Sequence, residues 1–262
     1  MQKVIAIEWM DRFVQLMDAL SDCSAKGIGI TELCRATLLS KATVHRMLQN
    51  MLSLNLVTQN GETKKYSLGP RSMKWGSAFL NAHDPLGLLS KYCNDISEAT
   101  QFYAFVCLFK GEEIFCTHTH QPSDVRSSFF VHVGQRMPVH CAAAAKIILA
   151  YQPENILQRM IDQEDLIRYT EFTTVDRQAL LDEYERIRSR QVAVCTQELE
   201  LGVAAFSVPV FHRPGRTVVS ISLVGDYMSM EARSDELMKQ LHATSVRASD
   251  HLMSMNALSS VF

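Results

Sequence analysis

Residues 40–52, SKATVHRMLQNML, combine short hydroxyl side chains with long hydrogen-bond donors at helical spacing. At 3.6 residues per turn, Val44, Leu48 and Met51 share one apolar face, which is typical of a helix packed on a core. The remaining polar side chains are our candidate contacts to a nucleic acid: Ser40, Lys41, Thr43, His45, Arg46, Gln49 and Asn50. Hydroxyls suit phosphate contacts, whereas Arg46 and Gln49 are long enough to reach base edges in a major groove.

The segments around this helix follow the order of a winged helix-turn-helix. Helical spacing at 4–20 precedes a short helix at 31–38, for which Thr31 is the expected N-cap. After the helix at 40–54, strand-like pieces at 56–58 and 65–68 flank Asn60-Gly61, which favours a tight hairpin turn. Lys64 and Lys65 would then lie on the wing, beside the DNA backbone. The alternative is an ordinary amphipathic helix in a helical bundle.

The charge of the chain is unevenly distributed. Residues 1–82 contain ten lysines and arginines against six acidic residues, a net charge of +4, whereas the remainder carries −6. A basic first third on an acidic body indicates that the first third meets a polyanion, although a solvated basic face would give the same count.

Beyond residue 69 the pattern changes to a mixture of helices and strands. Gly69-Pro70 ends the module, and residues 70–82 have helical spacing up to a break at His83-Asp84-Pro85. Strand patterns at 102–109, 113–119, 204–211 and 217–224 alternate with helical ones at 86–100, 142–151, 153–163, 176–190 and 234–255. We therefore expect an α+β protein, with a winged helix-turn-helix domain at 1–69, a linker helix at 70–85 and a larger domain at 86–262.

Four blocks of the sequence together resemble the IclR family of bacterial transcription regulators. Residues 29–76 are similar to its DNA-binding module, and VGQRMPVHCAAAAKIILAY at 133–151 is similar to the start of its effector domain. QELELGVAAFSVPVF at 197–211 and SISL at 220–223 follow in the family's order. The DNA-binding module looks closest to sugar-acid regulators of the family. The resemblance implies a GAF-like effector-binding domain, a homodimer or dimer of dimers (homotetramer), and effector-controlled repression or activation.

The resemblance also implies where an effector binds. In the family, backbone amides at the start of the small-residue helix hold the effector's carboxylate, and the matching positions are Ala143 and Ala144. Ser220 and Ser222 match pocket serines. Independently of the family, a helix start made of small residues leaves N–H groups open to an anion, although an alanine run equally suits close helix packing.

Two positions of the expected pocket depart from the family pattern. Cys195 stands where an acidic residue is common, and Ala205 stands where a cysteine is common. Either the effector differs from the small keto acids of some relatives, or the pocket is partly degenerate.

We expect no metal, no cofactor and no catalytic residue. Cys116, His118 and His120 alternate along a predicted strand and would share one face, but the spacing offers no fourth ligand. His140 and Cys141 are sequence neighbours whose side chains would point apart, so they do not suggest a nucleophilic pair. Seven scattered cysteines without a CxxC pair, and no apolar run of about 18 residues, favour a cytoplasmic protein with reduced thiols and no membrane partner.

The sequence is therefore interpreted as a ligand-responsive regulator of a catabolic operon that binds a pseudo-palindromic operator in double-stranded DNA. Its expected effector is a small organic acid, for which a sugar acid is the working choice. Two alternatives stay open: a DNA-binding protein whose ligand-free sensor serves only oligomerisation, and a small-molecule-binding enzyme whose basic module serves only assembly.

Overall fold

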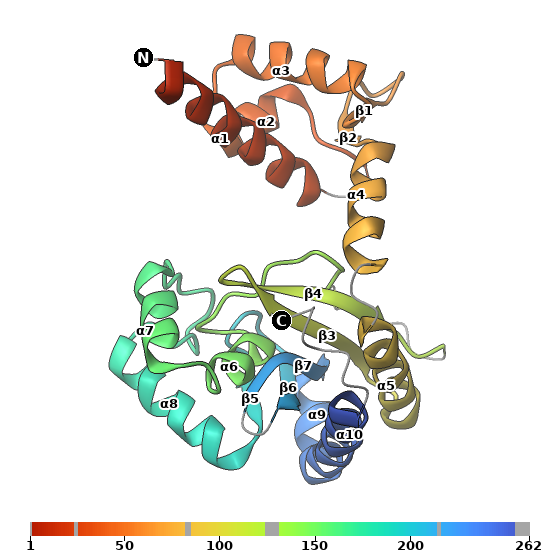
Figure 1. Cartoon of the computed structure of the whole chain (residues 1–262), viewed down its shortest axis with the longest axis vertical. Coiled ribbons are helices and arrows are strands. Elements are labelled where there is room, and N and C mark those ends of the chain that lie inside the picture. The colour runs from red at the N-terminus through yellow and green to blue at the C-terminus, as the bar shows by residue number, and fades with distance from the viewer. Residues whose placement is uncertain (1, 24–25, 82–84, 124–130, 214–215, 255–262) are drawn as a thin grey trace. The chain divides into compact units, whose positions relative to one another are not determined.

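The computed structural model describes residues 2–23, 26–81, 85–123, 131–213 and 216–254 (Figure 1). The chain divides into two units, Met1–Ala82 and His83–Phe262, and each unit has its own hydrophobic core. None of the helices in the described ranges is long and apolar enough to cross a membrane.

In its described residues, the first unit combines a helical bundle with a two-stranded wing. Its elements are α1 (Gln2–Ser21), α2 (Ile30–Thr37), α3 (Lys41–Ser53), β1 (Val57–Gln59), β2 (Tyr66–Leu68) and α4 (Pro70–Asn81). The inner face of α3 carries Val44, Met47, Leu48 and Met51, all buried against side chains of α1 and α2. The predicted winged helix-turn-helix fold is confirmed.

The wing docks on the bundle through a close backbone approach near Gly27. Ile28 forms a β-bridge with Tyr66 of β2, with backbone hydrogen bonds of 2.9 Å in both directions. Gly27 has a φ of +73°, and a Cβ there would lie 2.8 Å from the Tyr66 carbonyl oxygen. Only glycine fits this position without strain, and it holds the wing against the helices.

In its described residues, the second unit is a five-stranded antiparallel sheet with helices on both faces (Figure 1). The strands are β3 (Tyr103–Lys110), β4 (Glu113–His120), β5 (Ala193–Thr196), β6 (Val203–Arg213) and β7 (Arg216–Asp226), in the order β4-β3-β7-β6-β5. The helices are α5 (Pro85–Thr100), α6 (Ala143–Leu149), α7 (Glu154–Gln163), α8 (Arg177–Arg190), α9 (Tyr227–Ala232) and α10 (Ser234–Ser254). The expected α+β class is confirmed.

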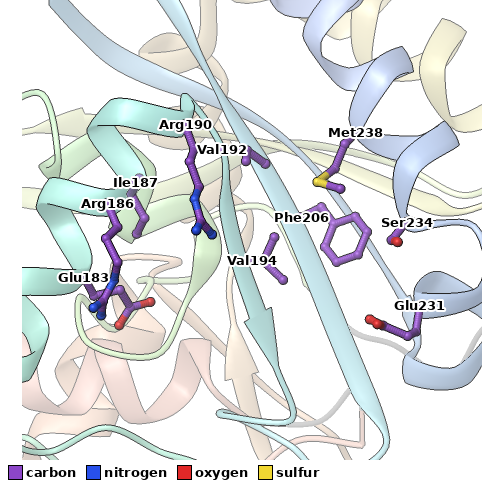
Figure 2. A pocket seen from close by; sticks show the side chains of 10 residues that line it. All are labelled: Glu183, Arg186, Ile187, Arg190, Val192, Val194, Phe206, Glu231, Ser234 and Met238. Carbon is purple, nitrogen blue, oxygen red and sulfur yellow. The ribbon is translucent and has the colours of Figure 1, made fainter.

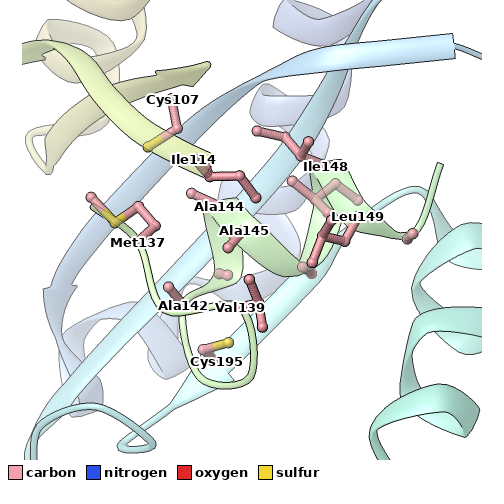
Figure 3. Packing of buried hydrophobic residues seen from close by; sticks show 14 of the residues in the cluster. Cys107, Ile114, Met137, Val139, Ala142, Ala144, Ala145, Ile148, Leu149 and Cys195 are labelled. Carbon is pink, nitrogen blue, oxygen red and sulfur yellow. The ribbon is translucent and has the colours of Figure 1, made fainter. Parts of the chain in front are cut away.

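Alternating strand residues feed two cores, one on each face of the sheet. Val106 and Ile221 belong to the core formed with α5 and α10. Phe105 and Cys107 belong to the opposite core, which α6, α7 and α8 cover. Every residue of α6 is buried, and its alanines let the helix backbone lie close to the strands (Figure 3).

Several local predictions need correction. The expected N-cap Thr31 lies inside α2; the helix begins at Ile30, and the Gly29 N–H donates to the Glu32 carboxylate at 2.8 Å. Strand β5 and helix α9 were not predicted. Helix α4 belongs to the first unit, and its role as a linker stays a prediction.

Candidate nucleic-acid interface and effector cavity

Helix α3 presents a polar surface opposite its buried side. Lys41, His45, Arg46, Gln49 and Asn50 are all exposed, and none of them forms an ion pair with another described residue. The long donors are therefore available to an outside partner. This is the arrangement that a helix needs to enter a major groove.

The two hydroxyl residues at the start of α3 cap the helix. Ser40 is the N-cap, and its Oγ accepts the Thr43 N–H at 3.2 Å. The Ser40 and Thr43 hydroxyls also form a hydrogen bond of 2.9 Å with each other. Ser40 is exposed and Thr43 half-buried, so the cap places both hydroxyls at the open N-terminal end of α3.

The wing differs in detail from the expected tight turn. β1 and β2 pair antiparallel, but six residues connect them from Asn60 to Lys65. The Asn60 side-chain oxygen accepts the N–H groups of Glu62 and Thr63, so asparagine organises the turn through its side chain rather than through an Asn-Gly pair with positive φ. The left-handed residue is Lys64, with a φ of 57°. Lys64 is exposed and Lys65 half-buried on this wing.

Two residues near α3 were not among the predicted contacts. Leu38, in the turn before α3, is 91% exposed and has a left-handed φ of 56°. Arg35 is exposed in the last turn of α2. A leucine that is both exposed and held at a positive φ is unusual, because leucine is usually buried and rarely adopts that conformation. The sequence pattern alone does not show either property of Leu38.

A small cavity of about 70 Å³ lies between α6, β5 and β6 in the second unit. Ala143, Cys195 and Ala205 line it, so the structure brings together three predicted positions that lie up to 62 residues apart. The remaining lining residues are Phe105, Val131, Gln135, Met137, Cys141, Ala142, Glu198, Leu199, Glu200, Val203 and Val224. Most of these side chains are apolar.

Three predicted effector residues lie near this cavity but do not line it. Ala144 is buried within α6. Ser222 is fully buried and its hydroxyl is hydrogen-bonded to the hydroxyl of Ser207 on β6. Ser220 is also fully buried, and its Oγ has no hydrogen-bond partner among the described residues.

Behind the cavity, α6 carries a buried lysine between two carboxylates. The Lys146 Nζ lies 2.7 Å from a Glu198 oxygen and 2.8 Å from a Glu183 oxygen. Burial alone would lower the pKa of Lys146, but the neighbouring carboxylates of Glu183 and Glu198 raise it above its usual value. Burial also raises the pKa of the Cys195 thiol well above its usual range, so Cys195 is neutral and the carboxylates are the true counter-charges.

This lysine–carboxylate cluster, Lys146 with Glu183 and Glu198, compensates its own charges, and Glu200 is the lining carboxylate that lies outside it. Burial raises the pKa of Glu198, while Lys146 partly holds that pKa down. Burial raises the pKa of Cys141 to about 12, so this lining thiol is neutral as well. The sequence analysis did not predict the pairing of Lys146 with Glu198, which joins residues 52 positions apart.

The alternation of Cys116, His118 and His120 is broken in the structure. The pairing of β3 with β4 shifts register between Val106 and Cys107, opposite this stretch. Cys116 joins the core around α6, whereas His118 and His120 contact Asn94 and Glu98 of α5 at 2.8 and 2.7 Å. The expectation that all three share one face is therefore wrong, and the described residues include no group of three or more metal-ligating side chains.

His140 packs as part of the scaffold. Its Nε2 lies 2.9 Å from the Ile167 carbonyl oxygen, and its ring stacks on Tyr169 at 6.0 Å. The neighbouring Cys141 instead lines the cavity.

An outward-facing helix of donors, a basic wing and a separate α+β domain define a class: winged helix-turn-helix regulators with a second, sensor-type domain. The chain belongs to the IclR family of bacterial transcription regulators. Residues 10–61 match the IclR helix-turn-helix domain, and residues 79–250 match the bacterial transcriptional regulator IclR C-terminal domain.

Individual relatives agree with this assignment. The HTH-type transcriptional regulator KdgR of Escherichia coli is 28% identical over 223 residues, covering 85% of this chain and 84% of its own length. The DNA-binding transcriptional repressor YiaJ of E. coli is 26% identical over 245 residues, covering 92% and 86%. An IclR-type regulator from Alicyclobacillus acidocaldarius has the same fold, with a TM-score of 0.77 at 21% identity, covering 93% of this chain and 98% of its own.

Proposed function

We propose that this protein is an effector-responsive transcription regulator that reads a pseudo-palindromic operator through α3 and the β1–β2 wing. The observation that supports this most directly is the α3 surface, where five exposed polar side chains have no charged partner among the described residues. Lys64 and Lys65 supply further positive charge on the wing. Long donors on α3 would contact bases, and the wing would follow the phosphate backbone.

The test is operator affinity measured over a salt series. Arg46→Ala should cost about 1–3 kcal/mol in specific binding and relax the base preference, because a bidentate contact is lost. Lys64→Ala should weaken binding to all sequences and lower the salt slope by about one. Arg190→Ala, an exposed arginine of the second unit, is the matched control. Unchanged affinity and base preference for Arg46→Ala would exclude it from the reading surface.

Assembly as a homodimer, or as a dimer of dimers, belongs to the same proposal. One such module covers too little DNA for tight specific binding. Trp9, Met10 and Val14 on α1 are exposed, as are Met73 and Trp75 on α4, and all are suited to burial in a second copy. Phe79 and Leu80 of the same helix are further apolar candidates for this contact, and they lie outside the described side chains. Sedimentation showing a monomer at micromolar concentration with full operator affinity would contradict this arrangement.

The effector site proposed is the cavity lined by Ala143, Cys195 and Ala205. The N–H group of Ala143, which lines the cavity, has no acceptor among the described residues, so it could bind a carboxylate there. An IclR homolog from Microbacterium hydrocarbonoxydans, with a TM-score of 0.73 at 16% identity, has been crystallised with 4-hydroxybenzoate, an organic acid. At about 70 Å³ and with mostly apolar walls, the cavity suits a compact organic acid better than a long sugar acid unless the walls move.

Operator release by a panel of organic acids, sugar acids included, tests the sensor. Effector coupling of about 1–3 kcal/mol would change operator affinity roughly five- to 150-fold. Ala143→Phe should abolish this response, whereas Ala243→Phe, on the exposed side of α10, should not. Because Ala143 is buried, Ala205→Leu provides a second, milder obstruction. Folded variants that respond like the parent would place the sensor site elsewhere.

A second candidate function is a ligand-free sensor domain that serves only oligomerisation. It is favoured by the small cavity and by Cys195 and Ala205, which leave few polar groups facing the interior. A thermal-shift screen separates the two candidates, because a ligand that binds only the folded protein raises its melting temperature.

A further inference from the structure

The edge of the sheet formed by β5 lies in a groove that the DNA-binding and effector roles do not use. The groove has a volume of about 610 Å³ and runs between α8 on one side and α9 and α10 on the other (Figure 2). Its lining residues are Glu183, Arg186, Ile187, Arg190, Val192, Val194, Phe206, Glu231, Ser234 and Met238. The compact effector cavity opens instead on the α6 side of the same strand.

The backbone of β5 offers hydrogen-bonding groups to this groove. Among the described strands, β5 pairs with β6 alone, and the ladder continues beyond it, with the Gln197 N–H donating to the Val203 oxygen at 2.7 Å. Paired and outward residues alternate in an antiparallel ladder, so Ala193 and Cys195 bond to β6, whereas the N–H and C=O groups of Val194 and Thr196 point outward.

Exposed edge strands usually carry a lysine, a proline or a bulge that prevents further pairing. The described β5 residues, AVCT, contain no such feature. Instead, Val194 is 38% exposed at the centre of the edge. No side chain of β5 blocks an added strand, although the four-residue length of β5 limits how many main-chain hydrogen bonds that strand can form.

The two walls of the groove differ in chemistry. On the α8 side, Arg186 and Arg190 stand one turn apart, both exposed and without an ion pair among the described residues. On the side of α9 and α10, Phe206 and Met238 form an apolar surface next to Val194, and Glu231 adds one exposed carboxylate to this wall (Figure 2). Side chains of an added strand would point alternately to these two walls.

A second copy of this chain is a poor occupant on charge grounds. A twofold axis perpendicular to the sheet would pair β5 with the partner's β5 and keep each face of the sheet continuous. Helix α8 would then face its own copy. The acidic lining residue of α8, Glu183, is already paired with Lys146, so it would not offset repulsion between the Arg186 and Arg190 pairs.

We propose that the β5 groove binds an extended acidic peptide segment of a partner protein by adding it to the sheet as a sixth strand. Acidic side chains of the segment alternate with apolar ones: the acids contact Arg186 and Arg190, and the apolar residues pack on Phe206 and Met238. Main-chain hydrogen bonds to Val194 and Thr196 supply affinity that does not depend on sequence.

The test uses a fluorescently labelled peptide of alternating glutamate and valine, titrated with the full-length protein and followed by anisotropy. Arg186→Glu/Arg190→Glu should weaken binding about ten-fold or more, since both charge contacts become repulsive. The matched double reversal Lys91→Glu/Lys239→Glu changes two exposed charges that do not line the groove and should leave binding unchanged. A lysine–valine peptide should not bind.

A backbone test separates strand addition from simple charge attraction. Val194→Pro removes one outward N–H and should weaken binding about five-fold, because an edge strand tolerates proline at such a position. A peptide N-methylated at the residues facing β5 lacks the same kind of main-chain hydrogen bond and leaves the protein unchanged. It therefore tests strand addition even if the Val194→Pro variant fails to fold.

Three results would overturn the proposal. The lysine–valine peptide could bind as well as the acidic one, the N-methylated peptide could bind as well as the unmodified one, or Val194→Pro could change the oligomeric state, which would show that a second copy occupies the groove. Loss of operator binding by Arg46→Ala has no bearing on any of these outcomes.

Discussion

The surface of α3 and the cavity beside α6 use polar groups in opposite ways. On α3, Lys41 and Arg46 extend into solvent with no partner among the described residues. Around the cavity, Lys146 is fully buried and bound to Glu183 and Glu198. A DNA-reading surface keeps its donors free for an outside partner, whereas a buried site must satisfy its charges internally before any ligand arrives.

The largest expected effect on stability comes from replacing one lysine in each region with methionine. Lys146→Met should lower the free energy of unfolding by about 3–5 kcal/mol, because it leaves two carboxylates uncompensated at a buried position. The matched change Lys41→Met should leave stability nearly unchanged and weaken operator binding. Chemical denaturation and operator titration measure both quantities. A loss of less than about 1 kcal/mol for Lys146→Met would break the contrast between the two regions.

The hydrogen-bonded pair of Ser207 and Ser222 on the sheet tests the same contrast between exposed and buried polar groups. Ser207→Ala should cost about 1–3 kcal/mol, since it leaves the buried Ser222 hydroxyl without its partner. Ser207→Ala/Ser222→Ala should cost less than the single change, because no unsatisfied group remains. The measurement is again the free energy of unfolding. If the double variant instead loses more stability and also loses its effector response, Ser222 serves the ligand as the family resemblance implies.

At the N-terminal end of α3, Ser40 has a structural role as N-cap and a proposed role in DNA binding, and both can be tested. Ser40→Ala removes the N-cap and should cost about 1 kcal/mol of stability. Ser40→Asp retains a capping oxygen and should keep stability but weaken DNA binding through repulsion of phosphate. Thermal unfolding and operator affinity separate the two effects. Equal affinity for Ser40→Asp and the parent would mean that no phosphate lies near this residue.

Substitution of Leu38 should have the smallest effect on stability. Leu38→Asn should raise stability by roughly 1 kcal/mol or less, because asparagine tolerates the left-handed conformation and an exposed apolar group is removed. If Leu38 contacts a thymine methyl group, operator affinity should fall at the same time. A fall in stability would show that Leu38 makes a contact which its 91% exposure does not indicate.

Helical and strand periodicity predicted the first unit almost completely. The apolar face of α3 repeats within a few residues, so Val44, Leu48 and Met51 could be placed inside without knowing any long-range contact. The wing turn was wrong in detail because the Asn60 side chain, rather than an Asn-Gly pair, closes it.

The second unit shows where local patterns fail. β5 has only four residues and begins two residues after the left-handed Gln191, so no alternation is long enough to reveal it. The register shift beside Cys107 separates Cys116 from His118, although the sequence shows an unbroken alternation. The pairing of Lys146 with Glu198 depends on how α6 lies against the chain after β5, which no short spacing contains. The resemblance to the family supplied Ala143, Cys195 and Ala205 as neighbours, and local reasoning did not.

The position of the lysine–carboxylate cluster behind the cavity has a practical consequence for building biosensors. The walls at Ala143 and Ala205 are small side chains on α6 and β6, while the charges that stabilise this region belong to Lys146 and its partners. Libraries that vary the walls and leave the cluster intact should therefore yield folded reporters with altered inducer choice. If the proposed function holds, the inducer of such reporters would be selected by cavity shape, and the α3 surface could be kept unchanged.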